Sequence, residues 1–154
     1  MNRKTILAAL VGICAGVAVC FAADSSIGTW KLNEAKSKFA AGASKNTTVV
    51  IEAAGDMVKV TVDGTLGDGS PAHNEWTGKM DGKDYAVTGD PASDMRAYKT
   101  VNDHKWALTG KKGGKQTISG SIEVSADGKT RTVTATSTGA DGKKMTNTSV
   151  YDKQ

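Results

Sequence analysis

The chain has 154 residues and a formal net charge of +4, with 38% hydrophobic residues and 2 cysteines. This length supports one hydrophobic core, so we expect a single globular domain. The lysines are scattered among acidic residues rather than gathered into a basic run with interleaved aromatics, and this excludes the usual pattern of a nucleic-acid-binding protein.

The first 22 residues are typical of a secretory signal peptide. Asn2-Arg3-Lys4 is a short positive segment, residues 6–19 form an uncharged apolar run, and Cys20-Phe21-Ala22 places small residues before a predicted cut at Ala23. An uncleaved anchor is the alternative, but the run is shorter than the ~20 residues that span a bilayer. Lipid attachment at Cys20 is disfavoured by the bulky Val19 before it. We therefore predict a signal peptide over 1–22 and one domain over 23–154.

This signal predicts a periplasmic or secreted protein with no membrane-spanning segment after its removal. Cys14 and Cys20 both lie in the leader, so the mature chain has no disulfide to stabilise it. Loss of Arg3 and Lys4, with no acidic residue, lowers the formal charge from +4 to +2.

Short runs of alternating apolar and polar residues dominate the rest of the chain and predict β-strands. Residues 34–43 contain Gly42 and few large apolar residues, so we interpret them as a crossing loop with one helical turn. The predicted strands are 27–33, 47–54, 57–66, 72–80, 83–89, 95–101, 105–111, 116–126, 131–139 and 144–152.

Tight glycine turns separate these strands. Asp81-Gly82, Asp127-Gly128, Asp141-Gly142 and Gly113-Gly114 suit two-residue hairpin loops, so consecutive strands should be antiparallel neighbours. An open sheet of this kind would leave two exposed edges, which closure removes. The predicted fold is all-β, a single antiparallel up-and-down β-barrel of about ten strands. An immunoglobulin-like sandwich is the main alternative, but it needs longer connections.

The alternation also predicts which side chains face the interior. Within each strand the chosen residues share one parity, and their neighbours are mostly polar. The predicted inward set is Val58, Val60, Val62, Trp106, Leu108, Ile118, Gly120, Ile122, Val124, Val133 and Ala135. We interpret Trp30 as a plug at one end of the barrel, with Gly28 allowing close packing.

With these segments placed, the chain resembles the calycins, specifically the lipocalin-like and fatty-acid-binding-protein-like barrels. Gly28-Thr29-Trp30-Lys31-Leu32 is similar to the opening G-T-W-K-L of that type, residues 51–62 resemble its second hairpin, and Ser149-Val150-Tyr151-Asp152-Lys153 resembles its closing R-x-Y-E-K. Small exported bacterial lipocalin-like proteins share the longer pattern over residues 28–39 and a terminal V-Y-D/E-K-Q. The resemblance implies a ten-stranded barrel that binds a ligand inside.

Two departures from the fatty-acid-binding type limit what the resemblance implies. The segment from Glu34 to Asn46 is too short for the family's helical lid, so we expect a barrel without one. The arginine of R-x-Y, which holds a fatty-acid carboxylate in that family, corresponds to Ser149. We therefore expect Tyr151 to lack a charged partner.

Arg96 and Tyr98 share one face of a strand and could hold an anionic group together. Met95, Ala97 and Val101 make an equally good inward face, so the direction of Arg96 is open at this point. The predicted ligand-binding residues combine an apolar wall with polar groups that fix one end of the ligand. They are Arg96, Tyr98, Trp106, Leu108, Ile122, Asn147, Ser149 and Tyr151.

The sequence favours a binding protein over an enzyme. It has no G-x-S-x-G elbow, no phosphate-cradling glycine loop and no histidine pattern next to a nucleophile. His73 and His104 are predicted to face solvent, and we expect no metal site and no cofactor. We predict a monomer that binds a small hydrophobic or amphipathic ligand in its interior. The alternative is a filled, ligand-free barrel that acts through its surface as an envelope or secreted interaction protein.

Overall fold

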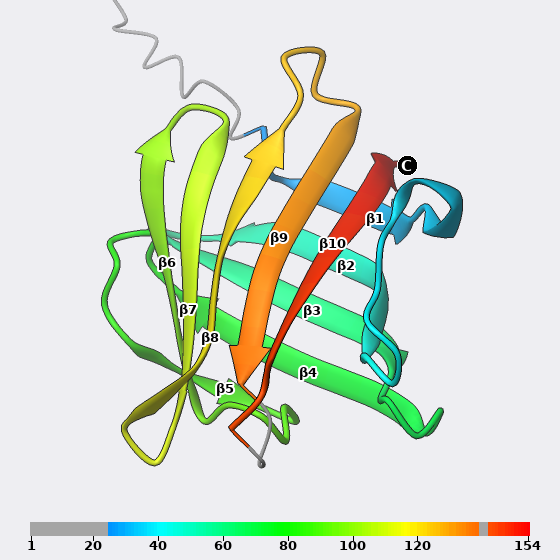
Figure 1. Cartoon of the computed structure of the whole chain (residues 1–154). Helices are drawn as coiled ribbons and strands as arrows, with labels where there is room; N and C mark the ends of the chain where they lie inside the picture. Colours follow the sequence, from blue (N-terminus) through cyan, green and yellow to red (C-terminus); the bar gives the residue numbers. More distant parts are fainter. Residues whose placement is uncertain (1–24, 139–141) are drawn as a thin grey trace, which may run out of the picture.

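The computed structural model describes residues 25–138 and 142–154, which form a closed barrel of ten antiparallel strands (Figure 1). The predicted signal peptide and its cut lie outside the described residues. The strands are β1 (Gly28–Leu32), β2 (Lys45–Ala54), β3 (Met57–Thr65), β4 (Pro71–Gly78), β5 (Tyr85–Thr88), β6 (Met95–Asn102), β7 (Lys105–Lys112), β8 (Lys115–Val124), β9 (Thr130–Thr138) and β10 (Lys144–Lys153).

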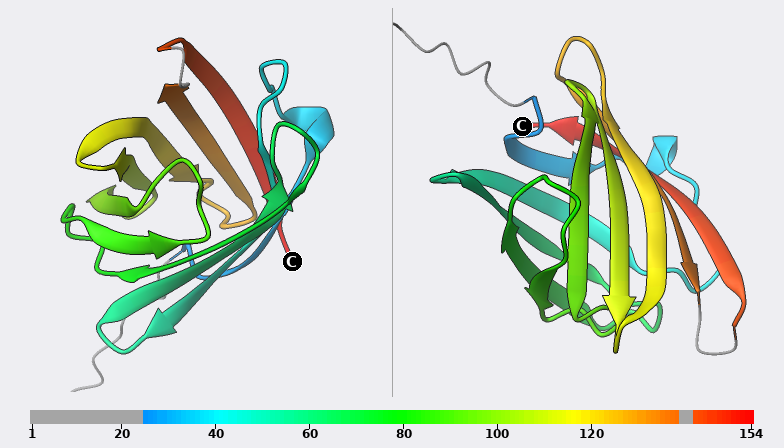
Figure 2. Two further views of the ribbon diagram at one scale, coloured as in Figure 1. Left: turned by 90° about the horizontal axis from the view of Figure 1, so that it is seen from below. Right: turned by 90° about the vertical axis from the view of Figure 1, so that its left-hand side faces the viewer.

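Each strand pairs with its neighbours in sequence, and β1 pairs with β10 to close the ring. Trp30 lies opposite Lys153 of β10 on one side and Val49 of β2 on the other. Strands β1 to β4 cross β6 to β10 at a steep angle, so the barrel resembles two crossed layers (Figures 1 and 2). The predicted up-and-down barrel is confirmed.

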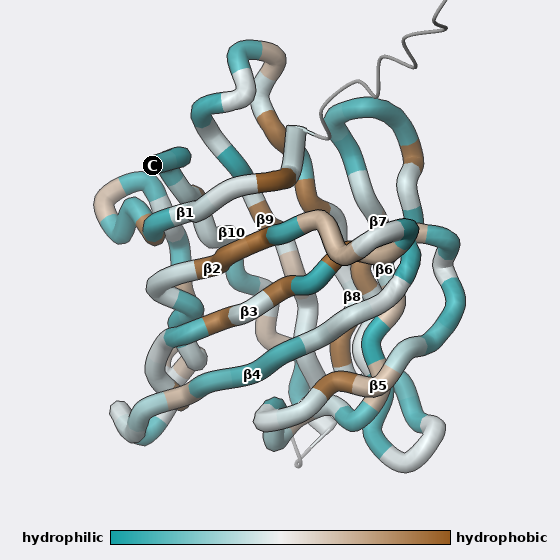
Figure 3. The backbone as a smooth tube through the Cα atoms, turned by 180° about the vertical axis from the view of Figure 1, so that it is seen from behind, coloured by the Kyte–Doolittle hydropathy of each residue, from teal (hydrophilic) through white to brown (hydrophobic). Residues whose placement is uncertain are grey.

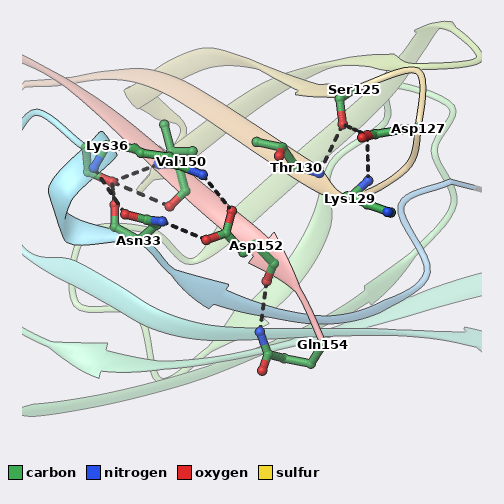
Figure 4. Close-up of polar contacts among 10 residues, drawn as sticks. Asn33, Lys36, Ser125, Asp127, Lys129, Thr130, Val150, Asp152 and Gln154 are labelled. Carbon is green, nitrogen blue, oxygen red and sulfur yellow. Dashed lines mark hydrogen bonds and ion pairs between the residues drawn. The ribbon is translucent and has the colours of Figure 1, made fainter.

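The connection between β1 and β2 carries no helical lid. Its only helical part within the described residues is a single 3-10 turn, η1 (Glu34–Lys36), as the sequence predicts. The Asn33 side chain accepts from the Lys36 backbone N–H at 3.2 Å and donates to the Asp152 carboxylate at 2.7 Å (Figure 4). The start of this connection is therefore fixed to the end of β10.

The hairpin turn between β8 and β9 shows how Asp-Gly chemistry builds one end of the barrel. The Asp127 carboxylate accepts from the Ser125 hydroxyl at 2.6 Å and from the Lys129 backbone N–H at 3.0 Å (Figure 4). The Thr130 backbone N–H donates to the Ser125 hydroxyl at 3.0 Å. Gly128 has a φ of 71°, which side-chain-bearing residues rarely adopt. This turn fixes the first residues of β9.

The core is the inner surface of the barrel. Apolar and polar positions alternate along most of β3, where Figure 3 shows separate brown stretches, whereas β2 carries one continuous apolar run, Val49-Val50-Ile51. Trp30 has no exposed surface, and its Nε1 donates to the Ser26 carbonyl at 2.8 Å. Trp30 is thus fully buried in the core, and its role as a plug at one end of the barrel stays a prediction. The other buried apolar and aromatic residues of this core include Val49, Ile51, Val60, Val62, Trp76, Tyr98, Trp106, Ile122, Val124 and Tyr151.

Gly120 marks a place where two strands approach too closely for a side chain. A Cβ at this position would collide with the Thr134 carbonyl oxygen and lie 2.8 Å from the Ala135 Cα. Both obstacles are backbone atoms of β9, which cannot move aside as a flexible side chain can. The glycine therefore allows β8 to lie closely against β9.

No helix among the described residues is long and apolar enough to cross a membrane. Within the same residues, no group of three or more His, Cys, Asp or Glu side chains is placed to hold a metal ion. His73 is exposed and contacts the Asp63 carboxylate at 2.6 Å through Nδ1.

Candidate functional site

Two adjoining cavities lie among the described residues of the barrel. The inner cavity has a volume of about 150 Å³ and lies among residues of β2, β3 and β6 to β10. The outer cavity has a volume of about 320 Å³ and is bounded by the β1–β2 connection, the end of β3 and the loop 89–92. The two cavities share five lining residues, so they meet at one level of the barrel: Ser44, Asn46, Arg96, Ile118 and Asn147.

The structure brings the predicted site residues together on the inner surface. Trp106 lines a smaller space of about 10 Å³, which also contacts Ser26 and shares Arg131 and Tyr98 with the inner cavity. The other seven line the inner cavity: Arg96, Tyr98, Leu108, Ile122, Asn147, Ser149 and Tyr151. The predicted inward parity of these strands is therefore correct.

Arg96 points into the barrel, which decides the alternative that the sequence left open. Arg96 and Tyr98 are 8% and 6% exposed, whereas Met95 and Val101 on the opposite face are 41% and 57% exposed. Residues that lie opposite each other on paired strands point to the same side of the sheet. Arg96 lies opposite Tyr85 of β5 and Gly110 of β7, and this pairing sets its orientation.

The charge of Arg96 is already neutralised. One guanidinium nitrogen contacts the Asp90 carboxylate at 2.7 Å, and the other donates to the side-chain oxygen Oδ1 of Asn74 at 3.1 Å. Burial lowers the pKa of the Arg96 guanidinium, but Tyr98 and Asp90 more than offset this, so the pKa lies above its ordinary value. Arg96 and Asp90 thus form an ion pair at the boundary between the two cavities.

Arg131 is the second arginine inside the barrel, and among the described residues it has no such carboxylate partner. It is 5% exposed and lines both the inner cavity and the small space beside Trp106. Its Nε is buried without a hydrogen-bond partner, and the guanidinium forms no ion pair with any carboxylate of the described residues. Burial lowers the pKa of the Arg131 guanidinium, and the nearby Tyr151 and Tyr98 oppose only part of this effect.

The expectation that Tyr151 lacks a charged partner is wrong. Arg131 lies opposite Tyr151 in the β9–β10 register, and its guanidinium carbon is 5.4 Å from the centre of the Tyr151 ring. The positive charge therefore comes from the neighbouring strand rather than from position 149. Burial raises the pKa of the Tyr151 phenol above its ordinary value, while Arg131 and a hydrogen bond with Ser149 oppose the rise. The phenol is thus a neutral donor at physiological pH.

Sequence reasoning missed three polar residues of the inner cavity, which are Ser44, Asn46 and Arg131. Arg131 has the same parity as Val133 and Ala135, which the alternation predicts to face inward, so the sequence contains the signal for it. The alternation contains no such signal for Asn46. A register shift between Asn46 and Thr48 breaks the alternation of β2, and Asn46 rather than Thr47 lines the cavity.

The inner cavity is amphipathic and carries a net positive charge. Its wall contains Val60, Val62, Leu108 and Ile122 together with hydroxyl and amide groups. Among the described residues that line either cavity, Arg96 and Arg131 are cationic and Asp90 is the one acid. Because Asp90 neutralises Arg96, the charge of Arg131 is left over.

Comparisons with known proteins identify the fold only. No family model and no curated protein matches the chain. Among solved structures, that of EF1p2_mFAP2b bound to DFHBI is similar, with a TM-score of 0.50 and 14% sequence identity, covering 86% of this chain and 97% of that chain. This likeness and the ten-strand closed antiparallel barrel show a calycin-like fold.

Proposed function

We propose that this protein binds one small amphipathic molecule inside its barrel. The observation that carries the proposal is the inner cavity of about 150 Å³, whose lining combines an apolar wall with the polar groups of Arg131, Tyr151, Ser149 and Asn147. Ligand sites in proteins usually have this composition, with few polar groups that fix orientation.

The cavity sizes indicate how large the molecule is. An apolar protein cavity of roughly 150 Å³ is known to hold benzene, so the inner cavity matches one six-membered ring or a short chain. The outer cavity of about 320 Å³ provides room for a substituent that extends past Arg96. The two together fall within the size range of ligand pockets, roughly 300–1,000 Å³.

A filled barrel that acts only through its surface fits the interior less well, because its side chains leave the inner cavity open. The solved structure of similar fold has a small molecule bound, DFHBI, which agrees with the use of such a barrel for binding.

We further propose that the protein is exported through its leader to the periplasm or beyond, is a monomer and performs no catalysis. The leader residues Arg3, Lys4 and the uncharged run after them support the export part.

The test is a titration with benzyl alcohol, a neutral amphipathic probe of one ring, followed by two-dimensional amide NMR. Shifts in the wild-type protein should concentrate on strands that line the inner cavity. Val133→Phe fills this cavity from β9 and should remove them. Thr134→Phe is the matched control, because Thr134 is the next residue of the same strand and is exposed. Saturable shifts that persist in Val133→Phe, or no shifts in the wild type, would contradict an internal site.

A further inference from the structure

The inner cavity contains one charge that no carboxylate of the described residues balances. Arg131 is buried, its Nε has no hydrogen-bond partner, and none of the described carboxylates pairs with its guanidinium. Removing a guanidinium from water without a counter-ion is costly, and a charged arginine cannot escape the cost by losing its proton under physiological conditions. A ligand with a negative charge would remove this cost on binding.

Arg96, in contrast, already has a carboxylate partner and does not need an anionic ligand. Its guanidinium already contacts Asp90 at 2.7 Å and Asn74 at 3.1 Å. An anion that took Arg96 would have to displace the Asp90 carboxylate, which is itself largely buried. The two arginines therefore have different roles: Arg96 holds the loop residue Asp90, and Arg131 is free to bind.

The groups around Arg131 also suit an anion. Tyr151, whose ring lies 5.4 Å from the guanidinium carbon, is a neutral phenol, and Ser149 beside it contributes a hydroxyl. Both are potential hydrogen-bond donors that line the same inner cavity. The carboxylate of Asp90 lines the outer cavity and not the inner one.

The position of Arg131 sets the orientation of such a ligand. Arg131 lines both the inner cavity and the small space beside Trp106, so it lies at the inner end of the site. Leu66, Pro91 and Met145 line the outer cavity at the other end. The charged group should therefore lie deep in the barrel, with the apolar part of the molecule pointing outward.

We propose that the ligand is a compact organic monoanion, such as a carboxylate on a single ring or short chain, and that Arg131 binds its charged group with help from Tyr151. This inference rests on the proposed function and adds the chemical class of the ligand. The inner volume of about 150 Å³ holds a single ring beside the guanidinium. A planar carboxylate matches the paired N–H groups of an arginine.

The experiment compares three molecules of almost the same shape by calorimetry: benzoate, benzamide and benzamidine, which are negative, neutral and positive. The wild-type protein should bind benzoate at least about tenfold more tightly than benzamide, a ratio that corresponds to 1.4 kcal/mol. Benzamidine should bind more weakly than both. Phenyl phosphate, run in parallel, distinguishes a carboxylate ligand from a phosphate ester.

Arg131→Met should reduce the ratio between benzoate and benzamide to about one. Arg131→Lys should keep part of the preference, because lysine retains the charge without the planar fork. The control Lys83→Met removes one positive charge from an exposed residue outside both cavities and should leave the ratio unchanged. In the wild type, benzoate should also shift the NMR signal of the Arg131 Nε–H.

Equal affinities for benzoate and benzamide in the wild type would overturn the inference and leave the proposed function standing. A preference for benzoate that persists in Arg131→Met would overturn it as well. If none of the three compounds binds, the inference fails, and the benzyl alcohol titration then decides separately whether the barrel has an internal site at all.

Discussion

Replacing the two buried arginines by methionine should change stability in opposite directions. Arg131→Met removes a buried guanidinium nitrogen that has no partner, and an orphaned donor of this kind costs about 1–3 kcal/mol. The substitution also removes the cost of burying the charge. In the wild type, the contact of the guanidinium with the Tyr151 ring offsets about 0.5–2 kcal/mol of this cost. We expect the ligand-free Arg131→Met protein to be more stable than the wild type by about 1–3 kcal/mol.

Arg96→Met breaks a buried ion pair and leaves the Asp90 carboxylate without its partner. Removing one member of such a pair typically costs about 3–5 kcal/mol. The two substitutions delete the same side chain at two interior positions, so their difference reports the presence or absence of a carboxylate partner rather than the general effect of losing an arginine.

Urea unfolding followed by tryptophan fluorescence measures both effects, because Trp30, Trp76 and Trp106 all lie in the core. The slope of the unfolding free energy against urea concentration should be the same in the three proteins. An equal slope indicates that all three unfold in the same two-state manner, so their unfolding free energies can be compared directly. Benzoate at a free concentration of one hundred times its Kd for the wild type should stabilise the wild type by about 2.7 kcal/mol. The same concentration of benzoate should stabilise Arg131→Met far less. Loss of more than about 1 kcal/mol in ligand-free Arg131→Met would refute the reasoning that Arg131 is an unbalanced charge.

Two further predictions concern packing and pH. Gly120→Ala should lower the free energy of unfolding by about 1–3 kcal/mol, because the new Cβ meets the backbone of β9, whereas Ser121→Ala on the opposite face should change it by less than about 0.5 kcal/mol. Urea unfolding checks this pair, and equal effects would contradict the close approach. Because the folded-state pKa of Tyr151 is raised, its contribution to stability is fully present below the unfolded value of about 10 and is lost as the pH rises from there through the folded value. Unfolding free energies between pH 9 and 11 should therefore fall less steeply in Tyr151→Phe than in the wild type, and identical slopes would contradict a buried neutral phenol.

Most of the architecture could be predicted from the sequence because its signals are local. Asp-Gly and Gly-Gly turns fix hairpins, and alternation fixes the inner face, so the ten strands lie within about two residues of their predicted bounds. The inward direction of Arg131 follows from the parity of Val133 and Ala135. Its role as an unpaired charge in the cavity does not follow from parity. That role depends on which side chains lie beside Arg131 after closure, and the whole ring of strands decides that none of the described carboxylates pairs with it.

Two features of the site were out of reach of local patterns. The register shift after Asn46 moves one residue of β2 to the other face, and nothing in the alternation marks its position. The pairing of Arg131 with Tyr151 joins residues of two strands through their register rather than through a motif within one strand. A comparison of motifs therefore assigns the missing arginine to position 149, while the folded barrel supplies a guanidinium from β9.

The central claim is that the barrel binds a small molecule through its interior. Native mass spectrometry of the protein purified from the cells that produce it, followed by extraction of the bound material into organic solvent, tests this most directly. One small molecule per chain should be recovered as an organic acid, and it should be absent from Val133→Phe purified in the same way. A wild-type protein with only the mass of its own chain, and no response to either benzyl alcohol or benzoate, would contradict it.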